Sequence, residues 1–294
     1  MKKTLIAMAA VAVAGVASAQ VTITGAIGAR FESSVSAAGV EDKGIGMSDS
    51  AIKFSASEDL GGGLSLAASA GFENMTKGGS APAGTGASLA IAGDFGSISF
   101  SNVEAGDYLP NDSITTVGNG TANDRVQYDS PTINGFKGFV QYGDGTAGAG
   151  THSTTNPSMV YGLSYAGGPL SADAAVLKVD STKHTTSDGW NRFGATYDLG
   201  VATVRYAQIN YKSAAAVKGK ETGLTITAPL GALTASASMA SHKDDGSTKL
   251  DGTEFSLTYA LSKRTSVNAT FRKYDSATAG VSPKRDRLTL THSF

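Results

Sequence analysis

The feature that most constrains this chain is a unit that repeats along its length. Each unit is an alternating segment, a short glycine-containing turn, a second alternating segment and a longer polar connection. Sixteen strand-like segments follow in this way, and the last ends at Phe294. In the first, apolar side chains from Val21 to Phe31 alternate with small, polar or charged ones from Thr22 to Glu32. A period of two over an even number of segments predicts an all-β, sixteen-stranded antiparallel transmembrane β-barrel, with one strand face in lipid and the other in water.

The connections between the segments fall into two size classes. Seven are short and contain Gly, Pro, Asn or Asp, as tight hairpins require. Eight are longer, at 34–48, 75–85, 104–123, 144–156, 181–189, 213–219, 243–251 and 276–284. Short turns at the periplasmic side and long loops outside are typical of an outer-membrane barrel. We expect bulges within 170–180 and 201–212, where the alternation slips.

The first residues resemble a secretory leader. Lys2 and Lys3 precede an apolar run over 5–16, and Ala17-Ser18-Ala19 follows as a small-residue cleavage site. A transmembrane anchor is the alternative interpretation, but the run is too short to cross a bilayer comfortably. The sequence therefore predicts a cleaved signal peptide over 1–19 and one barrel domain over 20–294.

Composition restricts the remaining possibilities. No later run approaches the roughly 20 apolar residues of a membrane helix, and the chain has no cysteine for disulfides. Without Lys2 and Lys3, 22 basic and 25 acidic residues leave a net charge of −3, which gives no reason to expect nucleic acid as a partner. A soluble β-sandwich is the alternative fold, but the narrow, alanine-rich apolar faces and the length of the chain fit it poorly.

At several turns and at both ends the chain resembles the general porins of Gram-negative bacteria, of the β-proteobacterial type. The matching motifs are Val-Thr-Ile-Thr-Gly over 21–25, Ser-Glu-Asp-Leu-Gly-Gly-Gly-Leu over 57–64, Gly-Asp-Phe-Gly over 93–96, Val-Gln-Tyr-Asp-Ser-Pro over 126–131 followed by Gly135-Phe136, and Thr-Leu-Thr-His-Ser-Phe over 289–294. The resemblance implies a homotrimeric channel in the outer membrane for passive diffusion of small hydrophilic solutes and ions. It also implies that the C-terminal segment is a signal, ending in Phe294, for the barrel assembly machinery. The residues of this signal are Leu288, Leu290, His292 and Phe294.

The third long connection, 104–123, is the longest in the chain and carries Tyr108. The resemblance implies that it folds into the lumen and narrows the pore, with Glu104, Asp107 and Asp112 as its acidic residues; an external flap is the alternative. The loop lacks the Pro-Glu-Phe-Gly-Gly motif of enterobacterial porins, so the resemblance does not define its path.

Alternation places a set of basic residues on the polar face of the strands, where lumen charges set ion selectivity. These predicted pore-wall residues are Arg30, Lys53, Arg125, Arg192, Arg205, Arg272, Arg285 and Arg287. An arginine-rich wall opposite an acidic loop predicts a transverse electric field and a mild preference for anions. Tyrosines near the strand ends are expected to form girdles at the two interfaces; they are Tyr128, Tyr142, Tyr161, Tyr165, Tyr197 and Tyr259.

Two other functions stay open. One is a substrate-specific channel with a saturable site; the other is a non-channel barrel or surface-adhesive β protein. The four histidines lie far apart and nothing singles out a nucleophile, so the sequence predicts no catalytic residue, no metal site and no cofactor. Outer-membrane lipid and lipopolysaccharide are expected partners. Acidic pairs in outer loops, Asp244-Asp245 and Glu41-Asp42, could bridge lipopolysaccharide through divalent cations; the alternative, which is the more common one, is that they are solvated loop acids.

Overall fold

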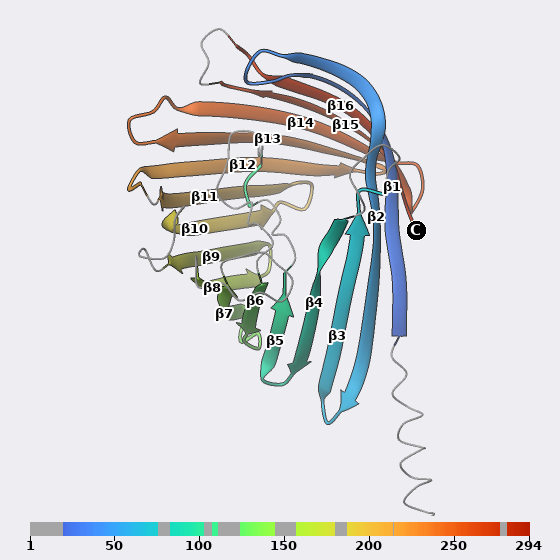
Figure 1. Ribbon diagram of the computed structural model, residues 1–294, viewed down its shortest axis with the longest axis vertical. Coiled ribbons are helices and arrows are strands. Elements are labelled where there is room, and N and C mark those ends of the chain that lie inside the picture. The colour runs from blue at the N-terminus through green and yellow to red at the C-terminus, as the bar shows by residue number, and fades with distance from the viewer. Residues whose placement is uncertain are drawn as a thin grey trace, which may run out of the picture.

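The computed structural model describes residues 20–75, 83–102, 108–110, 124–144, 157–179, 187–213, 215–276 and 281–294. Its strands are β1 (Gln20–Val35), β2 (Glu41–Gly61), β3 (Leu64–Glu73), β4 (Ala83–Gly93), β5 (Gly96–Ser101), β6 (Asp124–Asp129), β7 (Phe136–Asp144), β8 (Ser158–Gly167), β9 (Leu170–Val179), β10 (Ser187–Asp198), β11 (Thr203–Ser213), β12 (Lys218–Leu230), β13 (Leu233–Asp244), β14 (Leu250–Ala260), β15 (Thr265–Tyr274) and β16 (Lys284–Ser293). Figure 1 shows this wall of strands curving round an open interior until β16 lies beside β1.

The sixteen strands form one closed antiparallel barrel in which every strand pairs with its neighbours in sequence and β1 pairs with β16. The closing ladder runs from Ala26 opposite Ser293 to Val35 opposite Lys284. It continues through Phe294, whose N–H donates to the Gly25 carbonyl at 3.0 Å and whose carbonyl accepts from the Gly25 N–H at 3.0 Å. Closure removes the unpaired edges that hydrocarbon would not tolerate, so the predicted sixteen-stranded fold is confirmed.

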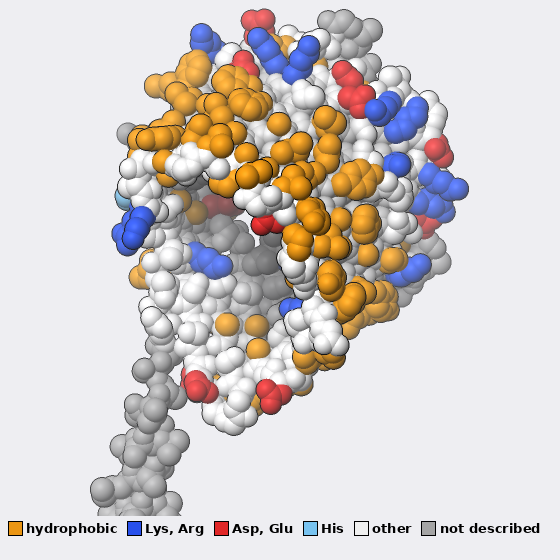
Figure 2. Space-filling model, turned by 180° about the vertical axis from the view of Figure 1, so that it is seen from behind, with side chains coloured by type: hydrophobic (Ala, Val, Ile, Leu, Met, Phe, Trp, Pro, Cys, Tyr) orange, Lys and Arg blue, Asp and Glu red, His pale blue; other side chains and the backbone are white. Residues whose placement is uncertain are grey.

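The apolar face of the strands lies on the outside of the barrel. Large hydrophobic side chains there are exposed, such as Ile23 at 57%, Phe100 at 59% and Met239 at 56%. Figure 2 shows the apolar side chains spread over the outer wall around the mouth of the barrel, with basic side chains inside the hollow. A sandwich would bury this face in a core. The alternation therefore produces a lipid-facing exterior and a polar lumen.

The tyrosines expected at the interfaces lie on this outer face near strand ends. Five of them are well exposed: Tyr128, Tyr142, Tyr161, Tyr197 and Tyr259. Tyr165 is less exposed because its ring packs on Phe136, with 4.7 Å between the ring centroids. Amphipathic rings at strand ends match the girdles of membrane barrels.

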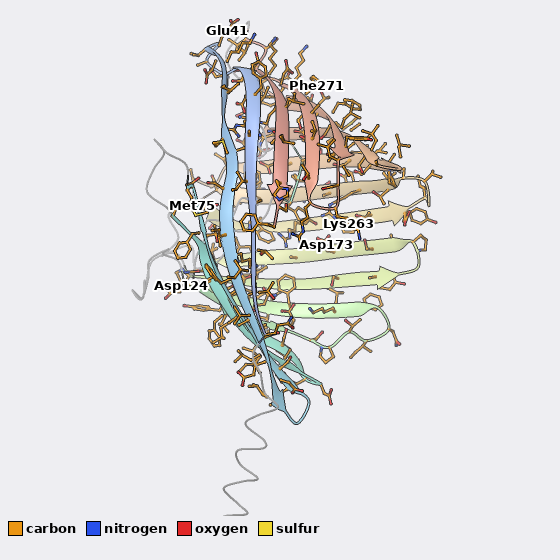
Figure 3. All side chains as sticks on the ribbon, turned by 90° about the vertical axis from the view of Figure 1, so that its right-hand side faces the viewer. Glu41, Met75, Asp124, Asp173, Lys263 and Phe271 are labelled. Carbon is orange, nitrogen blue, oxygen red and sulfur yellow. The ribbon has the colours of Figure 1, made fainter. Side chains whose placement is uncertain are left out.

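The first connection is much shorter than the predicted 34–48. β1 and β2 pair from Gln20 with Ser57 up to Val35 with Glu41, and only 36–40 form the turn, with Glu41 near the tip of the projecting hairpin in Figure 3. A backbone ladder needs no apolar pattern, so it continues through a polar, glycine-containing stretch that residue preferences exclude from strands.

The bulges are not where the slips in alternation predicted them. Pairing is regular along β8–β9, β9–β10 and β11–β12. Register shifts occur instead between Ile27 and Gly28, Asp59 and Gly61, Ala70 and Phe72, and Ser187 and Gly189. Small residues such as Ala174 and Ala175 fit either face, so they obscure the pattern without breaking the ladder.

No helix in the described part of the chain is long and apolar enough to span a bilayer.

Candidate pore constriction

Three residues of the third long connection, Tyr108, Leu109 and Pro110, lie against the lumen face of β9–β12. We call them the loop anchor. Leu109 is 4% exposed and packs with the buried side chains of Ala207 and Ile209 on β11. The side chains of those two residues point to the opposite face of β11 from the side chain of Tyr206, which is exposed on the outer wall. The anchor therefore sits inside the barrel.

Tyr108 makes the polar contact between the anchor and the wall. Its hydroxyl donates to Asp173 Oδ2 on β9 at 2.6 Å. Burial, together with this bond and the negative charge of Asp173, raises the pKa of Tyr108 above that of an ordinary tyrosine. The phenol therefore keeps its proton and remains a hydrogen-bond donor. In Figure 3, Asp173 lies in the wall of strands, away from Asp124 and Met75 at the left-hand edge.

Two predicted pore-wall arginines lie over the ring of Tyr108. The Arg192 guanidinium carbon is 4.4 Å from the Tyr108 centroid and 5.1 Å from that of Trp190. The Arg205 guanidinium is 5.1 Å from the same Tyr108 ring, and its Nη2 is 3.5 Å from Asp173 Oδ1. Cations over aromatic faces contribute more when they are partly desolvated. Arg192 and Arg205 thus hold Tyr108 of the loop anchor against the barrel wall.

Gly223 on β12 leaves the space that Pro110 fills. A Cβ atom at Gly223 would lie 2.4 Å from Pro110 Cδ and 3.2 Å from Leu109 Cδ2. Side-chain carbon atoms do not approach that closely, so only glycine lets the anchor rest on this strand. The close approach explains a glycine in the middle of a strand, where it otherwise weakens packing.

Next to the anchor, Glu221 is a fully buried carboxylate at 0% exposure. His242 Nδ1 on β13 lies 2.9 Å from Glu221 Oε1, and His242 Nε2 lies 3.4 Å from Asp244 Oδ2. The Tyr211 hydroxyl donates to Asp244 Oδ1 at 2.5 Å. The partners satisfy the polar atoms that burial would otherwise penalise. Asp244 faces the lumen here, on the same side of β13 as His242.

Further round the barrel, Arg30, Arg272, Arg285 and Arg287 form what we call the arginine cluster. Three of them surround Glu32 on β1: Arg287 Nε donates to its Oε2 at 2.8 Å, and the Nε atoms of Arg30 and Arg285 lie 3.7 and 3.8 Å from the carboxylate. One carboxylate therefore faces three guanidinium groups. This side of the lumen keeps a local excess of positive charge.

Arg272 on β15 pairs with Glu254 on β14, with Nε donating to Oε2 at 2.6 Å. Arg272 lies opposite Arg285 in the β15–β16 ladder, so it extends the cluster. Arg272 and Glu254 also line a recess of about 480 Å³ that reaches Arg205 and the loop anchor. One member of the arginine cluster, Arg272, therefore borders the same recess as the anchor.

The last two predicted basic residues also face the lumen. Lys53 pairs in register with Thr24 on the polar face of β1 and is exposed. Arg125 donates through Nε to Ser101 Oγ at 3.0 Å. All eight predicted pore-wall residues therefore project inward. The predicted acidic loop residues Glu104, Asp107 and Asp112 lie outside the described residues, as does the leader over 1–19.

At the C-terminus, Leu288, Leu290, His292 and Phe294 share the outer face of β16. Leu288, Leu290 and Phe294 are 51%, 48% and 42% exposed, and His292 Nδ1 lies 2.9 Å from Thr265 Oγ1. The ring of Phe294 covers Gly25, where a Cβ would come within 2.5 Å of Phe294 Cζ.

Three residues of this site were missed by sequence reasoning: Asp173, Glu221 and His242. Asp173 falls in the segment where a bulge was expected, so its facing was left unassigned. Leu224 points outward, and side chains alternate between the two faces along β12. Alternation would therefore have placed Glu221 and Gly223 on the inner face. His242 was set aside because no other histidine lies near it in sequence, whereas its partners come from β12 and from the end of its own strand.

The barrel encloses a water-accessible channel that is lined by charged side chains. The loop anchor lies against one part of its wall and the arginine cluster lies on another. Hydrophilic solutes can pass such a lumen, and lumen charges bias which ions do so. Among the described residues, no group of three His, Asp or Glu could hold a metal ion.

Comparisons with known proteins agree with a channel of this kind. The family model of the Gram-negative porins matches residues 5–279. The anion-selective porin from Comamonas acidovorans superposes with a TM-score of 0.76 at 20% identity, covering 94% of this chain and 100% of that chain. OmpT of Vibrio cholerae in its trimer form gives 0.71 at 14% identity, with 94% and 100% covered. No curated protein sequence matches the chain.

The fold and lumen define an outer-membrane β-barrel channel for passive diffusion. The chain belongs to the Gram-negative porin family.

Proposed function

We propose that this porin conducts small hydrophilic solutes and ions with a mild preference for anions. The observation that carries the proposal is the arginine cluster, in which four guanidinium groups face two carboxylates, Glu32 and Glu254. The cluster carries a formal excess of two positive charges, and one of its members, Arg272, borders the same recess as the loop anchor. Fixed charge beside a narrow aqueous path raises the local concentration of counter-ions.

The third loop, 104–123, would form the constriction. The contacts of Tyr108, Leu109 and Pro110 support this proposal because they hold the loop at the lumen wall. Glu104, Asp107 and Asp112 would then supply the acidic side of the transverse field. Residues 1–19 would be a cleaved signal peptide, and 20–294 would be the mature barrel. We also propose that the barrel has no enzymatic activity.

A homotrimer is supported by OmpT of Vibrio cholerae, a solved structure of similar fold that is described in a trimer form. The outer faces of β5 and β6 are the stretch that we expect a neighbouring subunit to cover. Exposed Ile98, Phe100 and Tyr128 occupy their outer faces. A neighbouring subunit would cover this stretch better than lipid, and native mass spectrometry of the detergent-solubilised porin would measure the assembly.

Single-channel recording under a salt gradient tests the anion preference. We expect a reversal potential of anion sign, and Arg287→Glu should shift it toward cations because it reverses a charge beside Glu32. Arg264→Glu makes the same charge change at an exposed position in the β14–β15 turn and should leave the potential near wild type. A cation-sign potential in the wild type, or equal shifts in both variants, would contradict the proposal.

A further inference from the structure

One row of inward-facing side chains runs across six neighbouring strands of the lumen wall, from β10 to β15. The register pairs each member with the next, and all of them line the recess of about 480 Å³ beside the loop anchor. In order, the members are Thr196, Arg205, Thr225, Ser238, Glu254 and Arg272. Thr203 and Thr227, which pair with each other two residues further along β11 and β12, line the recess as well. The recess therefore combines hydroxyl groups, two guanidinium groups and one carboxylate.

The row places a positive and a negative group on either side of a floor of hydroxyl groups. Neighbouring strands lie about 4.8 Å apart, so Arg205 and Glu254 are separated by about 14 Å along the wall. Thr225 and Ser238 lie between them, and all four side chains are half-buried. The Thr225 hydroxyl donates to Ser238 Oγ at 3.1 Å, which leaves the Ser238 O–H to donate and the Thr225 oxygen to accept. Such a floor suits ligand hydroxyl groups, which also do both.

Arg205, the positive group, keeps donors for a ligand. Its Nη1 and Nη2 lie 3.5 Å from Asp173 Oδ1, and Nη1 lies 3.4 Å from Thr196 Oγ1. These contacts are long, and a guanidinium carries five N–H groups in a planar fork. Such a fork binds a carboxylate through two parallel hydrogen bonds. The recess thus offers a carboxylate site at Arg205.

Glu254 separates this recess from a site for simple anions. Arg272 Nε and Nη2 both contact Glu254 Oε2, at 2.6 and 2.5 Å, whereas Oε1 accepts no hydrogen bond from the described part of the chain. An ionised carboxylate only accepts hydrogen bonds, so chloride or a plain carboxylate would meet a like charge there. A ligand hydroxyl group would instead donate to Oε1. The recess therefore fits a ligand with a carboxylate at one end and hydroxyl groups along its length.

The loop anchor gives the recess an apolar side. Leu109 and Pro110 both line it, and Pro110 is half-buried where it rests on Gly223. The C–H face of a sugar ring can pack on such a surface while its hydroxyl groups point to the row. Binding sites for small molecules combine apolar surface with a few convergent polar groups, usually in about 300–1,000 Å³. The recess meets both conditions.

We propose that this recess is a saturable site for hydroxylated monocarboxylates of the sugar-acid class on their way through the pore. Arg205 binds the carboxylate, Thr225 and Ser238 bind ring hydroxyl groups, and Glu254 accepts from a hydroxyl group at the far end. The inference rests on the proposed function, because the ligand reaches the recess only through an open channel. It adds selection by hydrogen bonding to a lumen that otherwise selects by charge.

Block of the single-channel current by glucuronate tests the site. The recess borders the loop anchor, so a bound ligand should interrupt the ion current, and the block should saturate with concentration. Glucose lacks the carboxylate and cyclohexanecarboxylate lacks the hydroxyl groups. Each should bind at least about tenfold more weakly, since one lost hydrogen bond costs about fivefold in affinity. Equal block by glucose would overturn the role of Arg205, and equal block by cyclohexanecarboxylate would overturn that of the hydroxyl row and Glu254.

A double variant places the site in the row. Thr225→Val/Ser238→Ala removes two hydroxyl groups without changing any charge, so the affinity for glucuronate should fall about tenfold while that for cyclohexanecarboxylate stays the same. Thr258→Val/Ser236→Ala makes the same changes at inward positions that do not line the recess and should bind as wild type does. Heat-modifiable migration shows that each barrel is folded. Unchanged glucuronate block in the first variant, or equal losses in both, would overturn the proposal.

The recordings also separate this inference from the proposed function. An anion-sign reversal potential without saturable glucuronate block would overturn the binding site and leave the anion preference standing. A cation-sign potential with saturable block that weakens in Thr225→Val/Ser238→Ala would contradict the anion preference and support the binding site.

Discussion

Tyr108 makes two kinds of interaction with three partners. Its hydroxyl donates to Asp173, and its ring accepts the guanidinium groups of Arg192 and Arg205. Asp173 in turn lies within ion-pair distance of Arg205. Because each partner orients the next, the loop is held by a network and not by one contact.

Removing the hydroxyl tests this network. Tyr108→Phe deletes the bond to Asp173 and keeps the ring, at a cost of about 1.5 kcal/mol for a bond to a charged acceptor. We expect transient closures in single-channel traces to become about tenfold more frequent, with the main conductance little changed. Tyr259→Phe, at an exposed tyrosine on the outer wall, is the matched control. Identical closure rates in all three proteins would show that the bond does not hold the loop.

The raised pKa of Tyr108 gives a second expectation. Folding holds the phenol in its neutral form, so its contribution to stability is fully present below the ordinary tyrosine pKa and is lost only as the pH rises through the higher folded-state pKa. The ultraviolet absorbance difference between wild type and Tyr108→Phe should stay flat through about pH 10, where an ordinary tyrosine is half ionised. A phenolate signal near that pH would contradict the burial of this hydroxyl.

At the scale of the element, β12 meets three requirements at once. Its outer face carries exposed Ile226, and its inner face carries the buried Glu221 and the bare backbone of Gly223. The strand must be apolar toward lipid, charged beside His242 and empty beneath Pro110. The period of two allows these demands because neighbouring side chains point to opposite faces.

Filling the space at Gly223 should dislodge the loop anchor. Gly223→Val places side-chain carbon atoms where Pro110 lies, so the loop must move toward the pore axis. We expect lower single-channel conductance and more closures. Gly84→Val on β4 adds the same side chain where no atom lies within 4 Å and should behave as wild type. Wild-type conductance in the Gly223 variant would mean that the anchor does not restrict the pore.

At the scale of the whole molecule, the ladder that closes the barrel extends as far as Phe294. Both backbone groups of Phe294 bond to Gly25, and its ring covers that glycine. The backbone bonds do not require the side chain, so closure can be tested separately from the proposed role of Phe294 in an assembly signal.

The variant Phe294→Ala tests barrel closure and assembly in the cell separately. The backbone bonds to Gly25 remain, so protein refolded in detergent should keep its heat-modifiable migration and conductance. In cells, the amount of folded barrel in the outer membrane should fall, because the proposed assembly signal is lost. Phe271→Ala removes a similarly exposed outer phenylalanine within β15 and should accumulate normally. Equal losses in both variants would point to general destabilisation of the outer wall.

The number of strands, and the side of the barrel wall to which each side chain points, were predictable because alternation is a local property of the sequence. Arg30 and Arg287 were placed inward from their neighbours alone, and the register of β1 with β16 agrees. The extent of the β1–β2 hairpin was not predictable, because pairing between 41 and 48 rests on backbone hydrogen bonds that leave little trace in side-chain pattern.

Contacts between side chains that are far apart in the sequence could not be predicted, for a different reason. Tyr108 and Asp173 are 65 residues apart, and Glu221 meets His242 only through the register of β12 with β13. Such pairs depend on how the closed barrel and the loop anchor bring distant residues together.

The sequence by itself determined a sixteen-stranded barrel with a polar interior, since a period of two acts on each strand independently. Only the tertiary structure decided which inward arginines hold the loop at Tyr108 and which gather around Glu32. It also decided that side chains from β10 to β15 line one recess beside the loop anchor. Closure of the ladder sets these positions, and no single segment contains that information.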